Sequence, residues 1–295
     1  MRGRDRFYYV AGLGFLALAK AKHLVHGYST PKTIGASEVD RCVEYDLRVV
    51  AGWLDHLRRY SSEGIDGKDV LELGPGSDIG TGIVLLARGC STYNACDVHD
   101  LAASASDVFY ERLFERLEDG DGVADLRDLE REVAAARRGM PSRLHYVVRK
   151  DFDLVETFGK SSIDLVVSQA AFEHFDDVEK TVEQLDQVCR PRARIVAEID
   201  LMTHSRWIRD KDPNNIYRYS PRVYDFFHFR GSPNRVRPFQ YQHAFERRGW
   251  TNVTITPLTT TQGRARLESG LSPLFANEKS RMDVLTFVLC ATKGA

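Results

Sequence analysis

One acidic residue stands just before a glycine-rich turn, and this pattern is well suited to holding a charged ligand. The segment reads Asp69-Val-Leu-Glu-Leu-Gly-Pro-Gly-Ser-Asp-Ile-Gly-Thr-Gly82. Glycines at a turn let a ligand approach the backbone, although they also serve tight turns where nothing binds. The carboxylate of Glu72 would repel the pyrophosphate of a dinucleotide, but it suits an ammonium or sulfonium group.

A second acid, Asp97, ends the next apolar run, 23 residues after Gly74. A carboxylate at the end of a strand can accept hydrogen bonds from ribose hydroxyls, as it does in dinucleotide sites. One such acid favours any nucleoside. The two acids together favour a nucleoside that carries a positive charge.

The acid followed by Gly-x-Gly in Glu72-Leu-Gly74-Pro-Gly76 resembles the first motif of the class I S-adenosylmethionine-dependent methyltransferases. The resemblance covers about residues 68 to 200. The segment Ile163-Asp-Leu-Val-Val-Ser-Gln-Ala-Ala-Phe-Glu-His-Phe-Asp-Asp177 adds support, because it is similar to the family's fourth strand and the Glu-His pair after it. The resemblance implies S-adenosyl-L-methionine as the cofactor.

The resemblance also assigns roles position by position. The turn from Glu72 to Gly76 would hold the methionine end of the cofactor, and Asp97 would bind the ribose. Asp151 would contact the adenine, with a solvated loop acid as the alternative, and the residues after the fourth strand would face the methyl-transfer centre. The set implied for cofactor binding is Glu72, Gly74, Pro75, Gly76, Ser77, Asp97, Val98, Asp151, Phe152, Ser168 and Gln169.

The chain departs from the family at Asp78, where many members have a third glycine. The next glycines are Gly80 and Gly82. This implies a turn of different shape and leaves the backbone contacts of residues 77 to 80 open.

Histidines near the expected methyl-transfer centre are the candidates for a general base. A base helps only if the acceptor is a hydroxyl or another group that is protonated near neutral pH. His174, after the fourth strand, is the first candidate and His204, after the fifth, is the second, while Glu173 would orient the pair. The alternative for His174 is a structural role that shapes the pocket. No metal site is expected, because the five cysteines form no Cys-x-x-Cys pair.

A parallel sheet would bring these strand ends together. From Lys68 onward, short apolar runs alternate with helical stretches, which is typical of a parallel sheet between layers of helices. Two later runs have no helix between them and predict an antiparallel pair that closes the sheet. The predicted fold class is α/β, a Rossmann-like doubly wound sheet, mostly parallel with an antiparallel last strand. Strands are predicted at 70–73, 92–95, 144–148, 163–167, 195–199, 253–258 and 284–291, and helices at 79–88, 104–118, 123–138 and 178–190.

Residues 1–60 are predicted to form an N-terminal helical extension, and residues 61–295 the methyltransferase domain. Within 37–60, apolar residues recur every three or four positions, which predicts an amphipathic helix capped by Ser37. Such a helix packs on the core or covers a cofactor.

A 13-residue apolar run at 7–19 follows Arg2, Arg4 and Arg6. The run is too short to span a bilayer. It predicts a packed or partner-facing helix, a helix on a membrane surface, or a cleaved signal peptide. The five cysteines form no Cys-x-x-Cys pair and are odd in number, which favours a reducing, cytoplasmic compartment. The apolar run argues against that compartment if it is a signal peptide, and in a cytoplasmic protein residues 1–23 could contact the inner face of a membrane.

An insert at 205–248 holds ten of the chain's thirty aromatic residues and ten Arg or Lys against four acids. We expect it to form part of the acceptor site, gripping an anionic or sugar-bearing acceptor by bidentate contacts and stacking. The alternative is an arginine-rich surface over a small aromatic core. The residues expected to act are Arg206, Trp207, Arg218, Tyr219, Arg222, Arg235 and Arg237.

The function expected from these features is S-adenosylmethionine-dependent methyl transfer to a small-molecule or saccharide-type acceptor, at oxygen. The alternatives are an inactive methyltransferase-like binding protein, an RNA methyltransferase, and a nicotinamide-dependent oxidoreductase, whose glycine fingerprint the turn partly imitates. Glu72 and the antiparallel final pair count against the last of these. The formal net charge of -1 gives no reason to expect a DNA partner.

Overall fold

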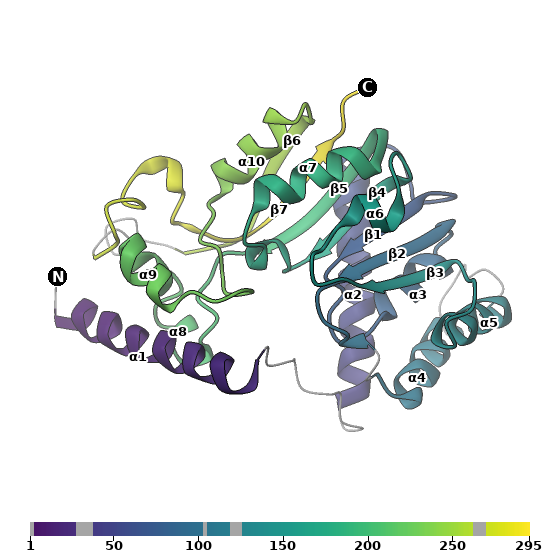
Figure 1. Ribbon diagram of the computed structural model, residues 1–295. Helices are drawn as coiled ribbons and strands as arrows, with labels where there is room; N and C mark the ends of the chain where they lie inside the picture. The colour runs from purple at the N-terminus through teal and green to yellow at the C-terminus, as the bar shows by residue number, and fades with distance from the viewer. Residues whose placement is uncertain (1–2, 28–37, 103–104, 119–125, 262–269) are drawn as a thin grey trace.

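The computed structural model describes residues 3–27, 38–102, 105–118, 126–261 and 270–295. Within these residues seven strands form one sheet in the order β3-β2-β1-β4-β5-β7-β6 (Figure 1). Neighbouring strands run parallel except at β7, which is antiparallel to both β5 and β6. The predicted fold class is confirmed. The strands are β1 (Asp69–Leu73), β2 (Thr92–Asp97), β3 (Leu144–Val148), β4 (Ile163–Gln169), β5 (Cys189–Asp200), β6 (Thr251–Thr260) and β7 (Val284–Thr292).

The fifth strand is longer than predicted. It starts at Cys189 instead of residue 195, because the preceding helix leads into it without a loop. The pairing with β4 is irregular between Ile163 and Leu165, which accommodates the polar residues at the start of β5. The polarity of this stretch concealed the strand in the sequence.

Helices cover both faces of the sheet (Figure 1). One face carries α2 (Val39–Tyr60), α3 (Gly80–Ala87), α4 (Asp107–Glu118) and α5 (Leu126–Arg137). The other carries α6 (Leu154–Phe158), α7 (Val178–Val188) and α10 (Pro238–Arg247). The predicted cap Ser37 lies outside the described residues, and α2 starts after Glu38 without a side-chain cap.

Strand alternation divides the buried side chains between the two faces. Val70 of β1 packs with the α2 and α3 side, and its neighbour Leu71 packs with the α7 and α10 side. Because successive side chains of a strand point to opposite faces, Glu72 must lie on the α2 and α3 side with Val70.

The helix α1 (Gly3–His26) lies against the insert (Figure 1). The insert folds into α8 (Arg206–Arg209), the 3-10 helix η4 (Asn215–Arg218), α9 (Pro221–Phe227) and α10. Its aromatic residues form a third core with Phe275 and Met282, and Tyr9, Leu13 and Leu16 of α1 pack on that core. The amide of Asn215 donates to the carbonyl of Tyr8 at 2.9 Å.

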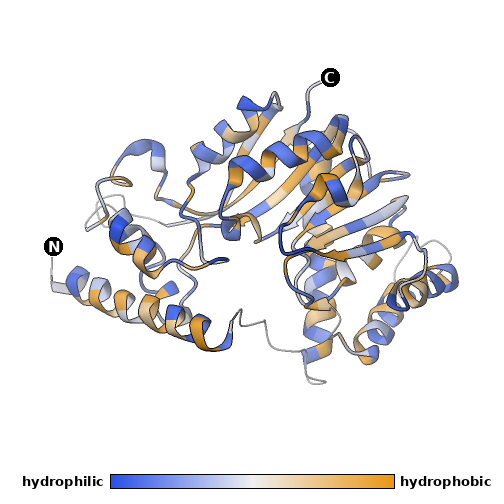
Figure 2. Ribbon diagram, viewed as in Figure 1, coloured by the Kyte–Doolittle hydropathy of each residue, from blue (hydrophilic) through white to orange (hydrophobic). Residues whose placement is uncertain are grey.

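The contact between α1 and the insert depends on Gly12. A Cβ atom at this position would lie 2.0 Å from both Asn215 Oδ1 and the Tyr219 hydroxyl oxygen. The opposite side of the helix stays exposed and apolar (Figure 2), with Phe7, Val10, Leu18, Leu24 and Val25 facing outward. Among the described helices none has the length and hydropathy that crossing a membrane requires.

Candidate active site

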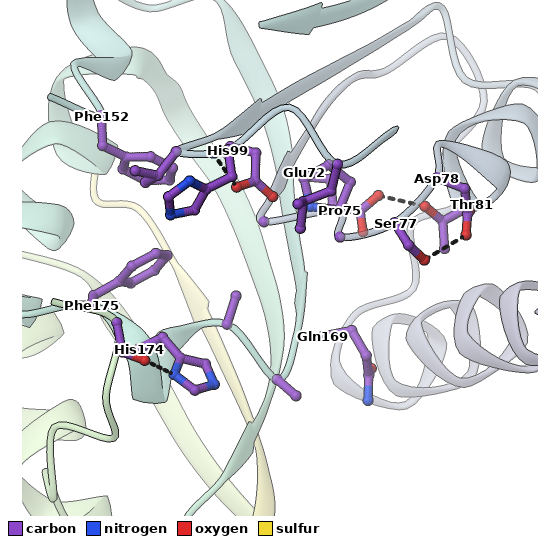
Figure 3. A pocket seen from close by; sticks show the side chains of 18 of the residues that line it. Glu72, Pro75, Ser77, Asp78, Thr81, His99, Phe152, Gln169, His174 and Phe175 are labelled. Atoms are coloured by element: carbon purple, nitrogen blue, oxygen red, sulfur yellow. Dashed lines mark hydrogen bonds between the residues drawn. The ribbon is translucent and has the colours of Figure 1, made fainter. Parts of the chain in front are cut away.

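A pocket of about 860 Å³ opens at the carboxyl ends of β1, β2 and β4 (Figure 3). In open α/β sheets, ligands bind in this position. Its volume is within the range of small-molecule and cofactor sites. All residues predicted to bind the cofactor line the pocket except Ser168: Glu72, Gly74, Pro75, Gly76, Ser77, Asp97, Val98, Asp151, Phe152 and Gln169.

The turn after β1 uses two glycines for different reasons. Gly74 has φ +68°, and a Cβ there would lie 2.9 Å from the Cβ of Ala171. Gly76 has φ +84°, and a Cβ there would meet no atom within 4 Å. Gly74 therefore lets the turn pack against the loop after β4, whereas Gly76 leaves its backbone open to the pocket.

Glu72 is a buried acid in the pocket wall, with only 2% of its surface exposed. Its Oε2 accepts hydrogen bonds from the hydroxyls of Thr81 and Tyr93, both at 2.6 Å. Burial raises the pKa of Glu72 to about 7. A cation bound beside this carboxylate would favour its ionised form.

Asp78, where the sequence departs from the resembled glycine motif, shapes the start of α3. Its Oδ1 accepts from the amide of Gly80 at 2.9 Å, and its Oδ2 accepts from the Ser77 hydroxyl at 3.2 Å. The Asp78 side chain therefore restrains residues 77 to 80, whose backbone contacts could not be predicted from the sequence. Asp46 of α2 lies in the same wall, and burial together with the charge of Asp78 raises its pKa well above the usual range.

Asp97 ends β2 on the other side of the glycine turn. Its Oδ1 accepts from the amide of His99 at 3.0 Å. Burial raises the pKa of Asp97, and hydrogen bonds from backbone amides oppose that shift. The residue is part of the pocket wall, as a ribose-binding acid would need to be.

The loop after β3 places Asp151 and Phe152 differently. Asp151 is exposed and accepts two hydrogen bonds from Arg149 at 2.8 Å, which hold the pKa of that carboxyl at about 2. Phe152 is buried, and its ring centre lies 5.2 Å from that of Phe175. These two rings form an apolar wall of the pocket (Figure 3).

The two residues that end β4 lie in different environments. Gln169 lines the pocket, but Ser168 is fully buried and donates to the carbonyl of Leu73 at 3.2 Å. The expectation that Ser168 faces the methyl-transfer centre is wrong, because alternation along the strand turns its side chain to the same face as Val166, which packs with α7 and α10.

The predicted catalytic residues gather beyond β4 and β5. Glu173 and His174 lie on the 3-10 helix η3 (Phe172–His174), and the rings of His174 and His204 meet edge to face with centres 4.8 Å apart. His174 lines the pocket, and its Nδ1 donates to the carbonyl of Gly231 at 2.7 Å. Glu173 was predicted to orient His174. In the structure the Gly231 carbonyl orients the His174 ring, whereas the Glu173 carboxylate makes no side-chain hydrogen bond among the described residues.

The sequence profile of a methyltransferase domain family matches residues 45–255, more than half of the chain. The chain belongs to this methyltransferase family. The match runs from α2 to β6 and includes the glycine turn, Asp97 and the Glu-His pair. The protein is an S-adenosylmethionine-dependent methyltransferase, and S-adenosylmethionine is its cofactor.

Solved structures that resemble this methyltransferase include an S-adenosylmethionine-dependent methyltransferase from Mesorhizobium loti, with 15% identity, a TM-score of 0.45, and coverage of 81% of this chain and 96% of that one. Geranyl diphosphate C-methyltransferase from Streptomyces coelicolor A3(2) has 14% identity and a TM-score of 0.46, over 89% and 87% of the two chains. Phosphoethanolamine N-methyltransferase 2 from Haemonchus contortus has 15% identity and a TM-score of 0.46, over 85% of this chain and 53% of that one. No curated protein matches the sequence.

Three of the insert arginines that were expected to contact the acceptor, Arg218, Arg235 and Arg237, do not line the pocket. Arg218 is buried and pairs with Asp212 at 2.7 Å. Arg235 is buried and donates to the carbonyl of Tyr219 at 2.9 Å. The prediction that these residues grip an acceptor is wrong, because the aromatic core uses them as internal hydrogen-bond donors.

Arg237 is fully buried and donates to the carbonyls of residues 280, 281 and 284, so it too is unavailable to an acceptor. Tyr219 is buried, and Trp207 packs on Phe7 of α1 with ring centres 6.2 Å apart. Arg222 is exposed away from the pocket lining, and the Arg206 side chain lies outside the described part of the structure. Of the alternative, an arginine-rich surface over a small aromatic core, the structure shows the core, but it buries three of the arginines within or beside it.

Sequence reasoning missed several residues of the pocket wall. Arg230 and Gly231 are the insert residues that line it, and Tyr45 and Asp46 of α2 close another side. A signal for Asp46 was present, because it interrupts the apolar stripe of α2 with an acid. For Arg230 the sequence offers no such signal, since many arginines surround it.

Proposed function

We propose that this methyltransferase methylates an oxygen atom of a small-molecule or saccharide-type acceptor. When bound, S-adenosylmethionine supplies a methyl group activated for in-line displacement. The pocket fits such a cofactor: the open space at Gly76 gives access to the backbone, and the buried Glu72 lacks a cationic partner among its hydrogen-bonding neighbours, which are both hydroxyls.

Different residues of the chain would bind different parts of the cofactor. Glu72 and the turn from Gly74 to Ser77 would hold the methionine end, and Asp97 with Val98 would hold the ribose. The apolar wall of Phe152 would receive the adenine, with Asp151 at its edge. Gln169 would lie near the methyl group. All of these residues line one pocket, which supports the assignment.

His174 is the proposed general base. The position of its proton supports oxygen as the methylated atom, because a neutral ring can deprotonate a hydroxyl. A carbonyl only accepts hydrogen bonds, so the bond to Gly231 fixes the proton on Nδ1 and leaves a lone pair on Nε2. Burial lowers the pKa of His174. The ring is therefore neutral at physiological pH and can accept a proton from a hydroxyl in the pocket.

The pocket wall carries charges of both signs, and its basic side chains are available to an acceptor that is anionic or rich in hydroxyls. Arg41, Arg48, Lys180 and Arg230 line the pocket, together with eight acids: Glu44, Asp46, Glu72, Asp78, Asp97, Asp151, Asp176 and Asp177. Arginine is suited to bidentate contacts with phosphate and carboxylate groups. Phosphorylated sugars and glycans are the first acceptors to screen.

The cofactor assignment is tested by calorimetric titration with S-adenosylhomocysteine. We expect binding in the wild type, loss of binding in Asp97→Ala, and unchanged melting of that variant without ligand. No binding by folded wild-type protein would favour an inactive scaffold. Normal binding by Asp97→Ala would contradict the assigned ribose site.

The base assignment is tested by the pH dependence of methyl transfer to an acceptor found in the screen. Because the pKa of His174 is lowered, the wild-type rate should rise with pH and level off below neutrality. His174→Asn should lower kcat by about 10²- to 10⁴-fold. A variant that keeps the wild-type rate and pH profile would refute base catalysis by this residue.

We also propose that α1 rests on the inner face of a membrane. The exposed side chains Phe7, Val10, Leu18, Leu24 and Val25 recur at helical spacing on one side, and Arg6 and Lys22 are exposed beside them. An apolar stripe flanked by cations binds anionic lipid surfaces. All five cysteines are free, which supports a cytoplasmic location.

The membrane proposal is tested by flotation of the full chain with vesicles. We expect binding to vesicles that contain phosphatidylglycerol and weaker binding to phosphatidylcholine alone. Leu18→Glu with Leu24→Glu should abolish flotation, whereas Leu274→Glu, an exposed leucine elsewhere, should not. Equal flotation of all three proteins would contradict a role for α1.

A further inference from the structure

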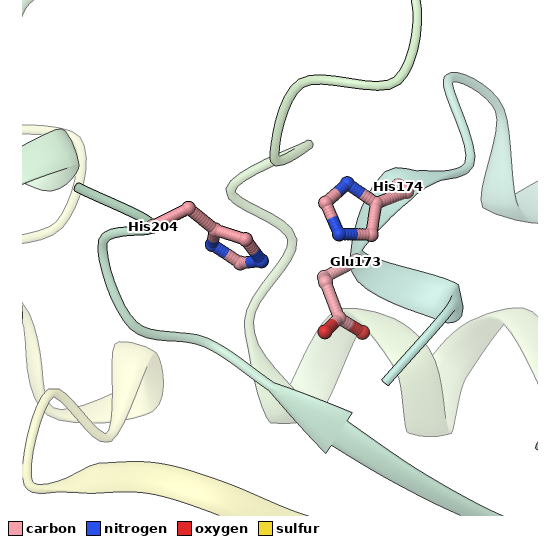
Figure 4. Close-up of side chains that lie close together, drawn as sticks. All are labelled: Glu173, His174 and His204. Atoms are coloured by element: carbon pink, nitrogen blue, oxygen red, sulfur yellow. The ribbon is translucent and has the colours of Figure 1, made fainter. Parts of the chain in front are cut away.

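Three potential metal ligands lie together next to the pocket. The ligand atoms of Glu173, His174 and His204 are all within 4.8 Å of one another, the one such group found among the described residues. Glu173 and His174 follow β4, and His204 follows β5. These two strands are parallel neighbours, so their carboxyl ends bring the three side chains to the same edge of the sheet (Figure 4).

Both histidines present the same free nitrogen to the cluster. His174 Nδ1 donates to the Gly231 carbonyl at 2.7 Å, and His204 Nδ1 donates to the Met202 carbonyl at 3.0 Å. Each carbonyl requires the ring proton to be on Nδ1, which leaves the Nε2 lone pair unprotonated. In metal sites the second ring nitrogen of a histidine ligand usually donates to a fixed oxygen in this way, which sets the tautomer and the orientation of the ring.

Glu173 supplies a buried carboxylate without a side-chain partner. It is 2% exposed, and neither of its oxygens makes a hydrogen bond of good geometry among the described residues, where only the backbone amides of Glu173 and Asp200 approach it. A buried polar group without a partner is costly, so an unpaired acid in a native site points to a missing ion, water or ligand. In Figure 4 its side chain starts beside the His174 ring, and its carboxylate lies below both rings.

The surrounding charge also favours a cation. The carboxylates of Asp200 and Glu198 lie near Glu173 and add negative charge to this part of the structure. Asp200 is paired with Arg209 at 2.6 Å, whereas Glu173 has no cationic partner among the described residues. A divalent ion would offset this local negative charge.

We propose that Glu173, His174 and His204 bind one divalent transition-metal ion. Two imidazole nitrogens and one carboxylate oxygen are the ligand set of catalytic Zn²⁺ sites and of non-haem Fe²⁺ sites, and three ligands leave a coordination position open. Metal–ligand bonds of about 2.0–2.2 Å put neighbouring ligand atoms about 3 Å apart, so the cluster contracts when the ion binds. His204 is exposed and gives the ion a route from solvent.

The open position would face the pocket, because His174 belongs to the pocket wall. With an ion bound, the Nε2 lone pair of His174 is a metal ligand and cannot accept a proton, so the ion would replace His174 as the group that activates an acceptor hydroxyl, by polarising its oxygen. This use of the ion rests on the proposed function, whereas ion binding itself does not. A metal site here could not be predicted from the sequence, since only the pairing of β4 with β5 brings residues 173 and 204 together.

Titration with Co²⁺ alone tests the site. Full-length protein is freed of metal with a chelator and titrated while the visible absorption of Co²⁺ bound through nitrogen and oxygen ligands is followed. We expect one Co²⁺ per chain in the wild type and at least tenfold weaker binding in both His204→Ala and Glu173→Gln. His243→Ala, an exposed histidine on α10, should bind like the wild type.

The outcomes separate the metal site from the proposed function. His204 is exposed, so its variant should melt like the wild type and remain informative even if Glu173→Gln fails to fold. Absence of the Co²⁺ signal in the wild type, or equal binding in His204→Ala, would overturn the site. Binding of S-adenosylhomocysteine is measured in the same preparations, and its absence would count against the proposed function alone.

Discussion

Replacement of Glu72 by glutamine should make the protein more stable and its cofactor site weaker. The substitution removes a negative charge but keeps the shape of the side chain. The hydroxyls of Thr81 and Tyr93 can still donate to the amide oxygen. Stability and binding therefore change in opposite directions, which a mere packing defect would not produce.

The size of the stability effect follows from the pKa. The pKa of Glu72 rises from 4.5 to about 7 on folding, and at about 1.36 kcal/mol per unit this corresponds to roughly 3 kcal/mol. Because the folded-state pKa is the higher one, the folded protein holds the proton more tightly than the unfolded chain. Ionisation of Glu72 therefore lowers the free energy of unfolding as the pH rises from about 4.5 to about 7. Above the upper value the whole loss is present.

Thermal unfolding at two pH values measures this effect. At pH 8, Glu72→Gln should melt about 5 °C above the wild type, from roughly 2.1 cal/mol/K of unfolding entropy per residue. At pH 4.5 the two proteins should melt together. Affinity for S-adenosylhomocysteine at pH 8 should fall roughly ten- to a hundredfold, since a charge-assisted hydrogen bond contributes about 1.5–3 kcal/mol.

Glu63→Gln is the matched control. Glu63 is an exposed acid whose pKa is lowered to about 2 by its hydrogen bonds to Arg194 and Lys68. Its substitution should leave ligand affinity unchanged and should not raise the melting temperature. If Glu72→Gln melts below the wild type at pH 8, or binds the ligand equally well, the reasoning about this carboxylate is refuted.

Three further substitutions test other features. Gly12→Ala should loosen α1 from the insert and speed its cleavage in limited proteolysis, whereas Gly14→Ala, with open space around it, should not; equal cleavage would contradict the docking role of Gly12. Gly74→Ala should lower the free energy of unfolding by about 1–3 kcal/mol because of its positive φ and its contact with Ala171, while Gly52→Ala in α2 should be neutral or stabilising. Arg237→Met should lower the free energy of unfolding, measured in urea, by about 3 kcal/mol or more, because it leaves buried carbonyls unpaired. A loss no larger than that of the exposed Arg222→Met would show that those hydrogen bonds contribute little.

The sheet and the glycine turn were predictable because their signals are local. Most strands contain a short apolar run, and Glu72 and Asp97 stand near the ends of two such runs. The alternation of a strand also decides which face Glu72 occupies. These inferences need only the sequence within a few residues of the position in question.

The insert was less predictable because its structure depends on distant partners. Charged residues are usually exposed, so the burial of Arg237 could not be expected from its neighbours. It is buried because carbonyls at residues 280 to 284, more than 40 positions away, accept its hydrogen bonds. The pairing of His174 with His204 likewise needs the order of the strands, which places β5 beside β4.

The contact between α1 and the insert also sets an order of events during synthesis. The amide of Asn215 and the carbonyl of Tyr8 that it binds are separated by 207 residues in the sequence. At about 5–20 residues per second, α1 would leave the ribosome roughly 10 to 40 s before the insert exists to cover its inner side. During that interval both sides of an apolar helix are uncovered, and a chaperone or a nearby lipid surface can engage it before its own chain does.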